Sequence, residues 1–214
     1  MTNPTPSLRH YAHSEVRADT IIHVAGVLFA INASLWLLAH VTGLSVVVSV
    51  SVYCVGLLSM ILASAAYHLS HHGPTKEVFR RIDHAAIFIM IAATYTPFAV
   101  NRLGHGTGTR LLVAIWLCAT VGVIMKLIFP HRFERLSVMS YLVTGWLIVA
   151  VAKPLSASIA SVDLWLLFIG GVVYSAGVTF FLMERIPFHK AIWHSFVLVA
   201  VALHFAAIMG EFAS

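Results

Sequence analysis

Four polar side chains lie at the ends of long apolar segments, where ionisable groups are costly in a membrane and usually face the protein interior. His68 closes one such segment and Asp83 opens the next. His189 and His194 open the last. Imidazole is the commonest metal-binding side chain, and catalytic zinc takes three protein ligands and a water molecule. These residue types therefore predict a zinc site, if the fold brings them together.

A serine one helical turn from the first of these histidines adds a polar contact. Ser64 precedes His68 by four residues, so both lie on the same face of a helix. Its hydroxyl is suited to orienting the imidazole or to holding a substrate carbonyl. Asp83 can ligate the metal, contact its bound water or act as the base. The alternative for each histidine is a structural one, in which it bonds lipid headgroups or the last carbonyls of a helix.

The composition is that of an integral membrane protein. Of 214 residues, 60% are hydrophobic and 10% charged, whereas soluble proteins carry about 25% charged residues. The net charge of +5 is spread among short loops and forms no patch, so binding to nucleic acid is not expected. Cys54 and Cys118 lie in separate apolar runs without paired spacing, which argues against a disulfide framework or a thiolate metal site.

Seven apolar runs are long enough to cross a bilayer, for which about 20 residues are needed. They cover residues 20–40, 45–68, 84–101, 109–129, 137–153, 162–183 and 191–211. We therefore predict an all-α fold, a seven-transmembrane helix bundle formed by residues 20–212. Residues 1–19 are predicted to form a polar N-terminal tail.

Basic residues predict how this bundle is oriented. Ten of the thirteen Lys and Arg residues fall on the side of the N-terminus, and three fall on the other. The positive-inside rule places the richer side in the cytoplasm. The N-terminus is then cytoplasmic, Ser214 lies outside, and the chain is a multi-pass protein of the plasma (inner) membrane. All four polar residues of the predicted zinc site lie at the cytoplasmic face.

Two further histidines bear on this site. His23 starts the first span on the same side and is a candidate for a supporting contact to the ligands. His204 lies ten residues beyond His194, about 15 Å deeper along a helix. It therefore cannot share a metal ion with His194, and we expect it to bond a neighbouring helix or to line a cavity.

Three short motifs, in this order, resemble the hemolysin III branch of the progestin and adipoQ receptor family. They are Ser64-Ala65-Ala66-Tyr67-His68, then Arg81-Ile82-Asp83-His84, then Ala191-Ile192-Trp193-His194 with His204 further on. The resemblance implies seven spans and a zinc ion near the cytoplasmic face. One histidine of the first motif and two of the last helix would hold the zinc, and the aspartate would contact its water. Eukaryotic relatives are linked to ceramidase activity.

The chain departs from that pattern at one position. The receptors have two histidines four residues apart at the start of the last span, but here residue 190 is Lys190 and the upstream histidine is His189. Five residues separate His189 from His194, which places the two about 140° apart on a regular helix. They converge only if Pro187 keeps residues 187–190 outside regular helix geometry. Otherwise Asp83 is the third ligand, or the site is empty.

The leading hypothesis is a zinc-dependent hydrolase that cleaves an amide or ester bond of a membrane lipid. The predicted metal ligands are His68, His194 and His189, with Asp83 as the base and Ser64 holding the carbonyl. One alternative is a receptor-like or regulatory membrane protein with structural zinc. Another is a cytolysin or channel, although the spans lack the polar rings of a pore. The expected partners are membrane lipids.

Overall fold

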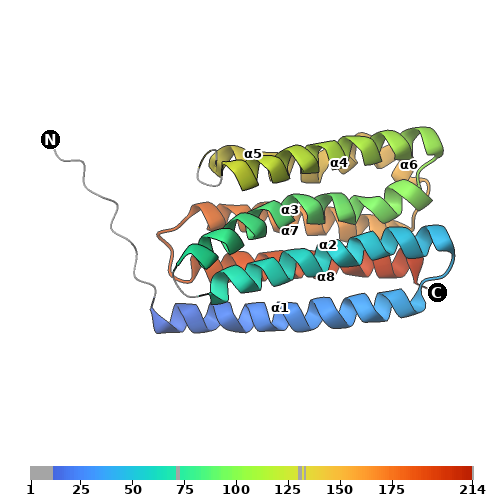
Figure 1. The fold of residues 1–214 in the computed structure, drawn as a ribbon. Helices are drawn as coiled ribbons and strands as arrows, with labels where there is room; N and C mark the ends of the chain where they lie inside the picture. Colours follow the sequence, from blue (N-terminus) through green and yellow to red (C-terminus); the bar gives the residue numbers. More distant parts are fainter. Residues whose placement is uncertain (1–11, 71–72, 130–131, 133, 214) are drawn as a thin grey trace.

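The computed structural model describes residues 12–70, 73–129, 132 and 134–213, and within them seven helices are long and apolar enough to cross a membrane (Figure 1). The fifth span is composite, with a 3-10 segment (η1) between two α-helices. The elements are α1 (His13–His40), α2 (Leu44–Leu69), α3 (Pro74–Asn101), α4 (His105–Ile128), α5 (Glu134–Gly145), η1 (Trp146–Val151), α6 (Ala152–Ser156), α7 (Ser161–Leu182) and α8 (His189–Phe212). The predicted all-α bundle of seven spans is confirmed.

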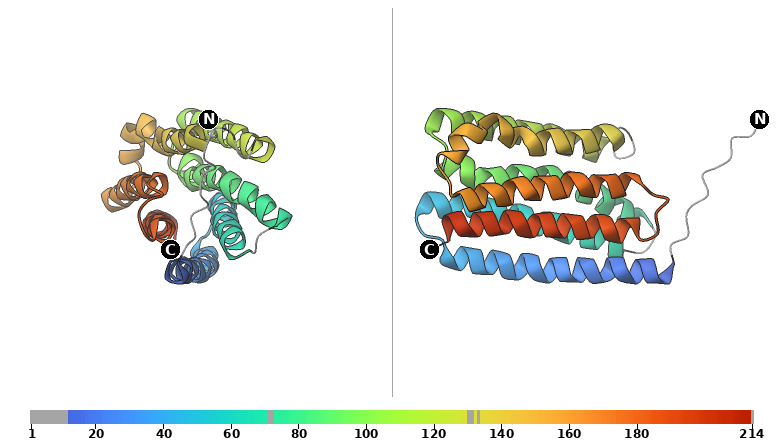
Figure 2. Two further views of the ribbon diagram at one scale, coloured as in Figure 1. Left: turned by 90° about the vertical axis from the view of Figure 1, so that its left-hand side faces the viewer. Right: turned by 180° about the vertical axis from the view of Figure 1, so that it is seen from behind.

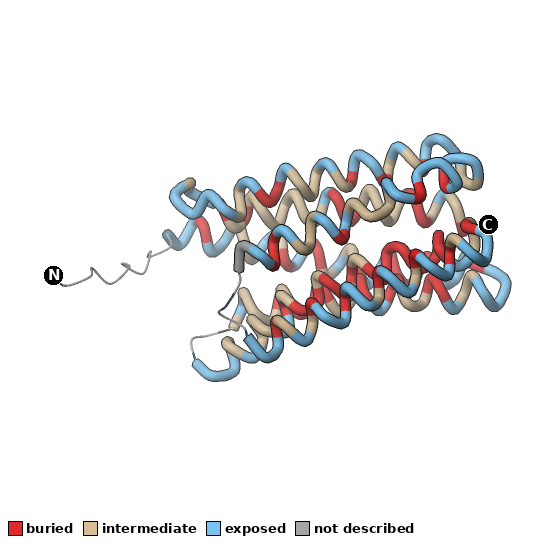
Figure 3. Tube along the Cα trace, turned by 90° about the horizontal axis from the view of Figure 1, so that it is seen from above, coloured by how far each residue is buried: buried red, intermediate tan, exposed pale blue. Residues whose placement is uncertain are grey.

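The helices run alternately up and down, so that α1 begins at one end of the bundle and α8 ends at the other (Figures 1 and 2). We call the end at which α1, α3, α5 and α8 begin the site end. α3 is the most enclosed span, with 72% of its apolar window buried. The outward faces of the other helices expose large apolar side chains such as Ile21 and Val121, as a lipid-facing surface requires (Figure 3).

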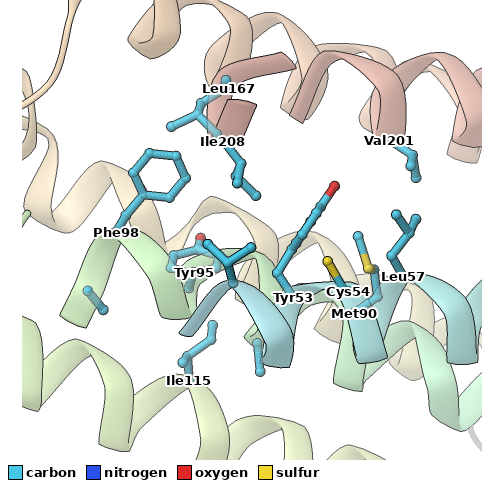
Figure 4. Packing of buried hydrophobic residues seen from close by; sticks show 14 of the residues in the cluster. Tyr53, Cys54, Leu57, Met90, Tyr95, Phe98, Ile115, Leu167, Val201 and Ile208 are labelled. Atoms are coloured by element: carbon cyan, nitrogen blue, oxygen red, sulfur yellow. The ribbon is translucent and has the colours of Figure 1, made fainter. Parts of the chain in front are cut away.

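Small residues bring neighbouring helices close together, as is common in membrane bundles. A side chain at Gly56 of α2 would meet the Cβ atom of Ala93 in α3 at 2.5 Å. A side chain at Gly177 of α7 would meet the Cβ atom of Phe196 in α8 at 2.8 Å. Tyr53, Leu57 and Phe98 are among the side chains that fill the core (Figure 4). These contacts hold α2 against α3 and α7 against α8.

Two helices begin seven or more residues before the apolar runs that predicted them. α1 starts at His13 and α3 at Pro74, whereas the runs start at residues 20 and 84. Hydropathy marks the apolar part of a helix, but polar first turns extend beyond it. Glu15 stabilises the start of α1 by accepting the backbone N–H of Ala12 at 2.9 Å. As a result, Asp83 lies inside a helix and not at its first residue.

The fifth span breaks its α-helical hydrogen bonding near Gly145, and Tyr95 of α3 satisfies the backbone there. The Tyr95 hydroxyl donates to the carbonyl oxygen of Gly145 at 2.6 Å. The Tyr95 hydroxyl oxygen in turn accepts the backbone N–H of Ile148 at 2.8 Å. Unpaired backbone groups are costly in a membrane, so this one hydroxyl fixes the fifth span against α3.

Removing that hydroxyl tests its role. We predict that Tyr95→Phe lowers the apparent Tm of the purified protein, because each buried backbone group left unpaired costs about 1–3 kcal/mol. Tyr53→Phe is the matched control, since the buried Tyr53 hydroxyl has no hydrogen-bond partner among the described residues. Equal Tm values for the two variants in a thermal unfolding assay would contradict this role.

Candidate metal centre

Helices α1, α2 and α8 bring four potential ligands together at the site end. Asp19 and His23 come from α1, His68 from α2 and His194 from α8. Each offers one ligand atom, and these atoms all lie within 4.8 Å of one another. The imidazole centroids are 4.9 Å apart for His23 and His68, and 4.5 Å apart for each of the other two pairs. Three rings from three helices therefore form a compact triangle.

Oxygen atoms of Asp19 face the Nδ1 atom of every ring in this triangle. Its carboxylate Oδ1 lies 2.6 Å from Nδ1 of His194, and Oδ2 lies 3.3 Å from Nδ1 of His68. Its backbone carbonyl oxygen lies 2.8 Å from Nδ1 of His23. Because carbonyl and carboxylate oxygens only accept hydrogen bonds, each Nδ1 carries the proton, and Nε2 of the neutral ring keeps the lone pair. Metal-binding histidines are usually oriented in this way.

Ser64 and Asp83 lie on the lone-pair side of His23. Nε2 of His23 is 3.3 Å from the Ser64 hydroxyl oxygen, and the Ser64 side chain lies beside the carboxylate of Asp83. Asp83 is buried, and its Oδ2 lies 3.4 Å from Nδ1 of His84. A hydroxyl group and a carboxylate thus border the triangle from α2 and α3.

The predicted site residues differ in where they lie relative to the four ligand atoms. His68 and His194 belong to the group of ligand atoms. Ser64 and Asp83 lie beside it, through His23. His189 is not in the group: α8 is helical from His189 onwards, so its side chain starts about 140° around the helix from that of His194. The third imidazole beside His68 and His194 in the structure is that of His23, so the ligand role that the sequence predicted for His189 has yet to be tested against one for His23.

Sequence reasoning missed Asp19 and gave His23 only a supporting role. The apolar run starts at residue 20, which left Asp19 in the predicted tail. The structure extends α1 back to His13, so Asp19 lies in its second turn. A signal was available: Glu15, Asp19 and His23 are four residues apart, the spacing of one helix face.

The first residue of that face positions the start of α8. The Glu15 carboxylate accepts the backbone N–H of Phe188 at 2.7 Å. Phe188 has a φ of 59°, in the left-handed region that non-glycine residues rarely adopt. Glu15 therefore helps to hold the strained turn before α8, and with it the direction in which His194 enters the triangle.

A cavity of about 420 Å³ extends from the triangle into the bundle. Most of its wall surface is apolar, and its lining comes mainly from α1, α2, α3, α5, α7 and α8. His204 lines it deeper in the bundle and contacts the carbonyl oxygen of Leu167 in α7 through Nε2, at 3.2 Å. Both roles expected for His204, a bond to a neighbouring helix and a place in a cavity wall, are confirmed.

Seven apolar helices, with a group of three histidines and an aspartate at one end, define a multi-pass membrane protein with a candidate metal-binding centre. The sequence model described as "Haemolysin-III related" matches residues 11–205. The chain therefore belongs to the hemolysin III family.

Curated relatives support this assignment. The chain is 40% identical over 195 residues to "Hemolysin-3 homolog" of Bacillus subtilis (strain 168), which covers 90% of this chain and 92% of the relative. It is 37% identical over 212 residues to "Hemolysin-3" of Bacillus cereus, covering 98% and 96%. It is 29% identical to "Monocyte to macrophage differentiation factor" of Homo sapiens over 163 residues, 73% of this chain and 67% of the relative. That similarity supports the link to the progestin and adipoQ receptor family. No solved structure matches the chain.

The triangle predicts which histidine substitutions weaken metal binding. Loss of a supporting contact lowers metal affinity by about 10–100-fold. Because His23→Ala would remove a ligand, we expect it to lower the affinity for Zn²⁺ by about 100-fold or more. His189→Ala, the matched control on α8, is expected to bind Zn²⁺ as the wild type does. Titration of metal-free protein with a competing zinc indicator measures both. The reverse ranking would show that the third nitrogen comes from α8.

Proposed function

We propose that this chain is a zinc-dependent hydrolase that cleaves an amide or ester bond of a membrane lipid. The observation that carries the proposal is the orientation of the three imidazoles. Asp19 holds every Nδ1 atom, so the three Nε2 atoms are the available donors. A set of three histidines with a fourth position left to water is a recurrent catalytic zinc site.

The donor set fits zinc. Imidazole nitrogen is a ligand for zinc, copper, iron and nickel, and a carboxylate beside metal-binding histidines raises their basicity. When bound, zinc lowers the pKa of a water molecule to about 7 and polarises a carbonyl oxygen. The buried Asp83 and the hydroxyl of Ser64 border the same space and supply the remaining polar groups.

Asp83 and Ser64 take the roles of proton carrier and carbonyl holder. The Asp83 carboxylate accepts the proton of the attacking water and returns it to the nitrogen or oxygen of the leaving group, as a general base and then a general acid. The Ser64 hydroxyl donates a hydrogen bond to the substrate carbonyl oxygen. His23 stays in place because its Nδ1 is tied to the backbone of its own helix.

The position of the site favours a lipid substrate. The triangle lies at one end of the bundle and opens into a cavity with mainly apolar walls. That end is the side with ten of the thirteen Lys and Arg residues, which puts the site at the cytoplasmic face of the plasma (inner) membrane. A lipid acyl chain in the cavity would bring its carbonyl carbon to Ser64 and Asp83.

Hydrolysis by the zinc-loaded protein tests the proposal. With fluorescent lipid amides and esters as substrates, we expect Asp83→Asn to lower kcat by about 10²–10⁴-fold, the usual contribution of a general acid–base group, while zinc content is unchanged. Asp163→Asn is the control, because Asp163 is a buried carboxylate of α7 at the opposite end of the bundle. Full turnover by Asp83→Asn would contradict the proposed role of Asp83 as the general base.

A second candidate function is a receptor-like or regulatory protein with structural zinc. It is favoured by one observation, that Asp19 offers a carboxylate oxygen within 4.8 Å of the imidazole ligand atoms, so an ion held on the Nδ1 side of the rings would have four protein ligands. Four protein ligands make a closed site, which is typical of structural zinc.

Asp19→Asn separates the two candidates. If Asp19 orients the imidazoles, the variant binds zinc about 10–100-fold more weakly and hydrolyses lipid at saturating zinc. If Asp19 is a ligand of a structural site, the variant loses zinc and thermal stability, and the wild type hydrolyses none of the lipids. Zinc titration, thermal unfolding and the lipid assay together give the answer.

A further inference from the structure

Three cationic side chains from three helices line the cavity on the side of the metal centre. They are Arg80 of α3, Lys126 of α4 and Lys190 of α8. Lys126 is only 2% exposed, although it lies in the last turn of an apolar helix. A buried ammonium group in a membrane span is costly and marks a functional site by default. None of these cations has a role in the proposed hydrolysis.

The cations all lie near the site end of their helices. The start of α3 and the end of α4 adjoin there, since Arg81 contacts the carbonyl oxygen of Leu127 at 3.5 Å. Glu77 fixes the guanidinium of Arg80 through two hydrogen bonds, at 3.0 and 3.3 Å. Two carboxylates, Asp83 and Glu184, line the same cavity. The deeper walls are mainly apolar.

We propose that this end of the cavity binds the phosphate group of an anionic membrane lipid, with the lipid's acyl chain in the apolar part. Phosphate oxygens form strong, charge-assisted hydrogen bonds with arginine and lysine. Basic pockets between transmembrane helices on the cytoplasmic side are sites for phosphate-bearing headgroups. A free anion would gain nothing from the apolar walls, whereas a phospholipid uses both parts of the cavity.

Together with the proposed function, on which this step rests, the phosphate site defines the substrate class as an acyl ester of a phospholipid. Ser64 and Asp83 also line the cavity, at a depth along the helices between that of the cations and that of His204. Water adds to the acyl carbonyl carbon and the acyl C–O bond breaks. Asp83 takes the proton from the water and gives it to the departing oxygen, so the products are a fatty acid and a lysophospholipid with a new hydroxyl group.

Binding of a matched lipid pair tests the phosphate site. Native mass spectrometry of the full chain in detergent micelles would compare phosphatidic acid with diacylglycerol of identical acyl chains. We expect phosphatidic acid to bind at least about tenfold more tightly, since one charge-assisted hydrogen bond is worth that factor. Lys126→Met and, independently, Lys190→Met should each lower the affinity for phosphatidic acid about tenfold. Lys153→Met, at an exposed lysine of α6 outside the cavity, is the control.

The outcomes separate this inference from the proposed function. Equal binding of the two lipids, or unchanged binding by both Met variants, overturns the phosphate site even if zinc-dependent hydrolysis is found. Lysine-dependent binding of phosphatidic acid by a protein that hydrolyses no lipid supports the phosphate site and overturns the enzyme. Displacement of phosphatidic acid by an equal concentration of inorganic phosphate would show a site for the free anion. Thermal unfolding checks that each variant is folded. If Lys126→Met does not fold, the binding of phosphatidic acid by Lys190→Met decides the question.

Discussion

The contact of Asp19 with three imidazoles is the interaction on which the site end of the bundle depends. Polar atoms inside a membrane span have to satisfy one another, because lipid offers them no hydrogen bonds. Asp19 meets this requirement for His68 and His194 with its carboxylate, and for His23 with its backbone carbonyl. Helices α1, α2 and α8 are thereby tied at one level. The same contacts leave the Nε2 atoms as donors, so the bond that stabilises the fold also prepares the proposed zinc site.

Two further polar contacts connect other parts of the bundle to these helices. Glu15, one turn before Asp19, holds the turn that starts α8 through the backbone of Phe188. Tyr95 ties the broken fifth span to α3, the most enclosed helix, and α3 also carries Asp83. The groups proposed to do chemistry therefore stand on helices that polar contacts connect to one another.

The number and order of the spans could be predicted because hydropathy is a local property of the chain. His68 and His194 could be predicted as well, since they lie at span ends that a charge count places on one side. Asp19 could not be found by hydropathy, because α1 continues through polar residues back to His13. The choice of His23 over His189 as the third imidazole depends on how α1 packs between α2 and α8. No spacing within one helix contains that information.

X-ray absorption at the zinc edge of the purified wild-type protein tests the central claim most directly, namely that three imidazoles oriented by Asp19 form a zinc site. We predict a four-coordinate ion with three imidazole nitrogens at about 2.0–2.1 Å and one oxygen. The multiple-scattering pattern of the rings counts the imidazoles. A spectrum that requires only two imidazoles, or a protein that takes up no zinc, would contradict the account.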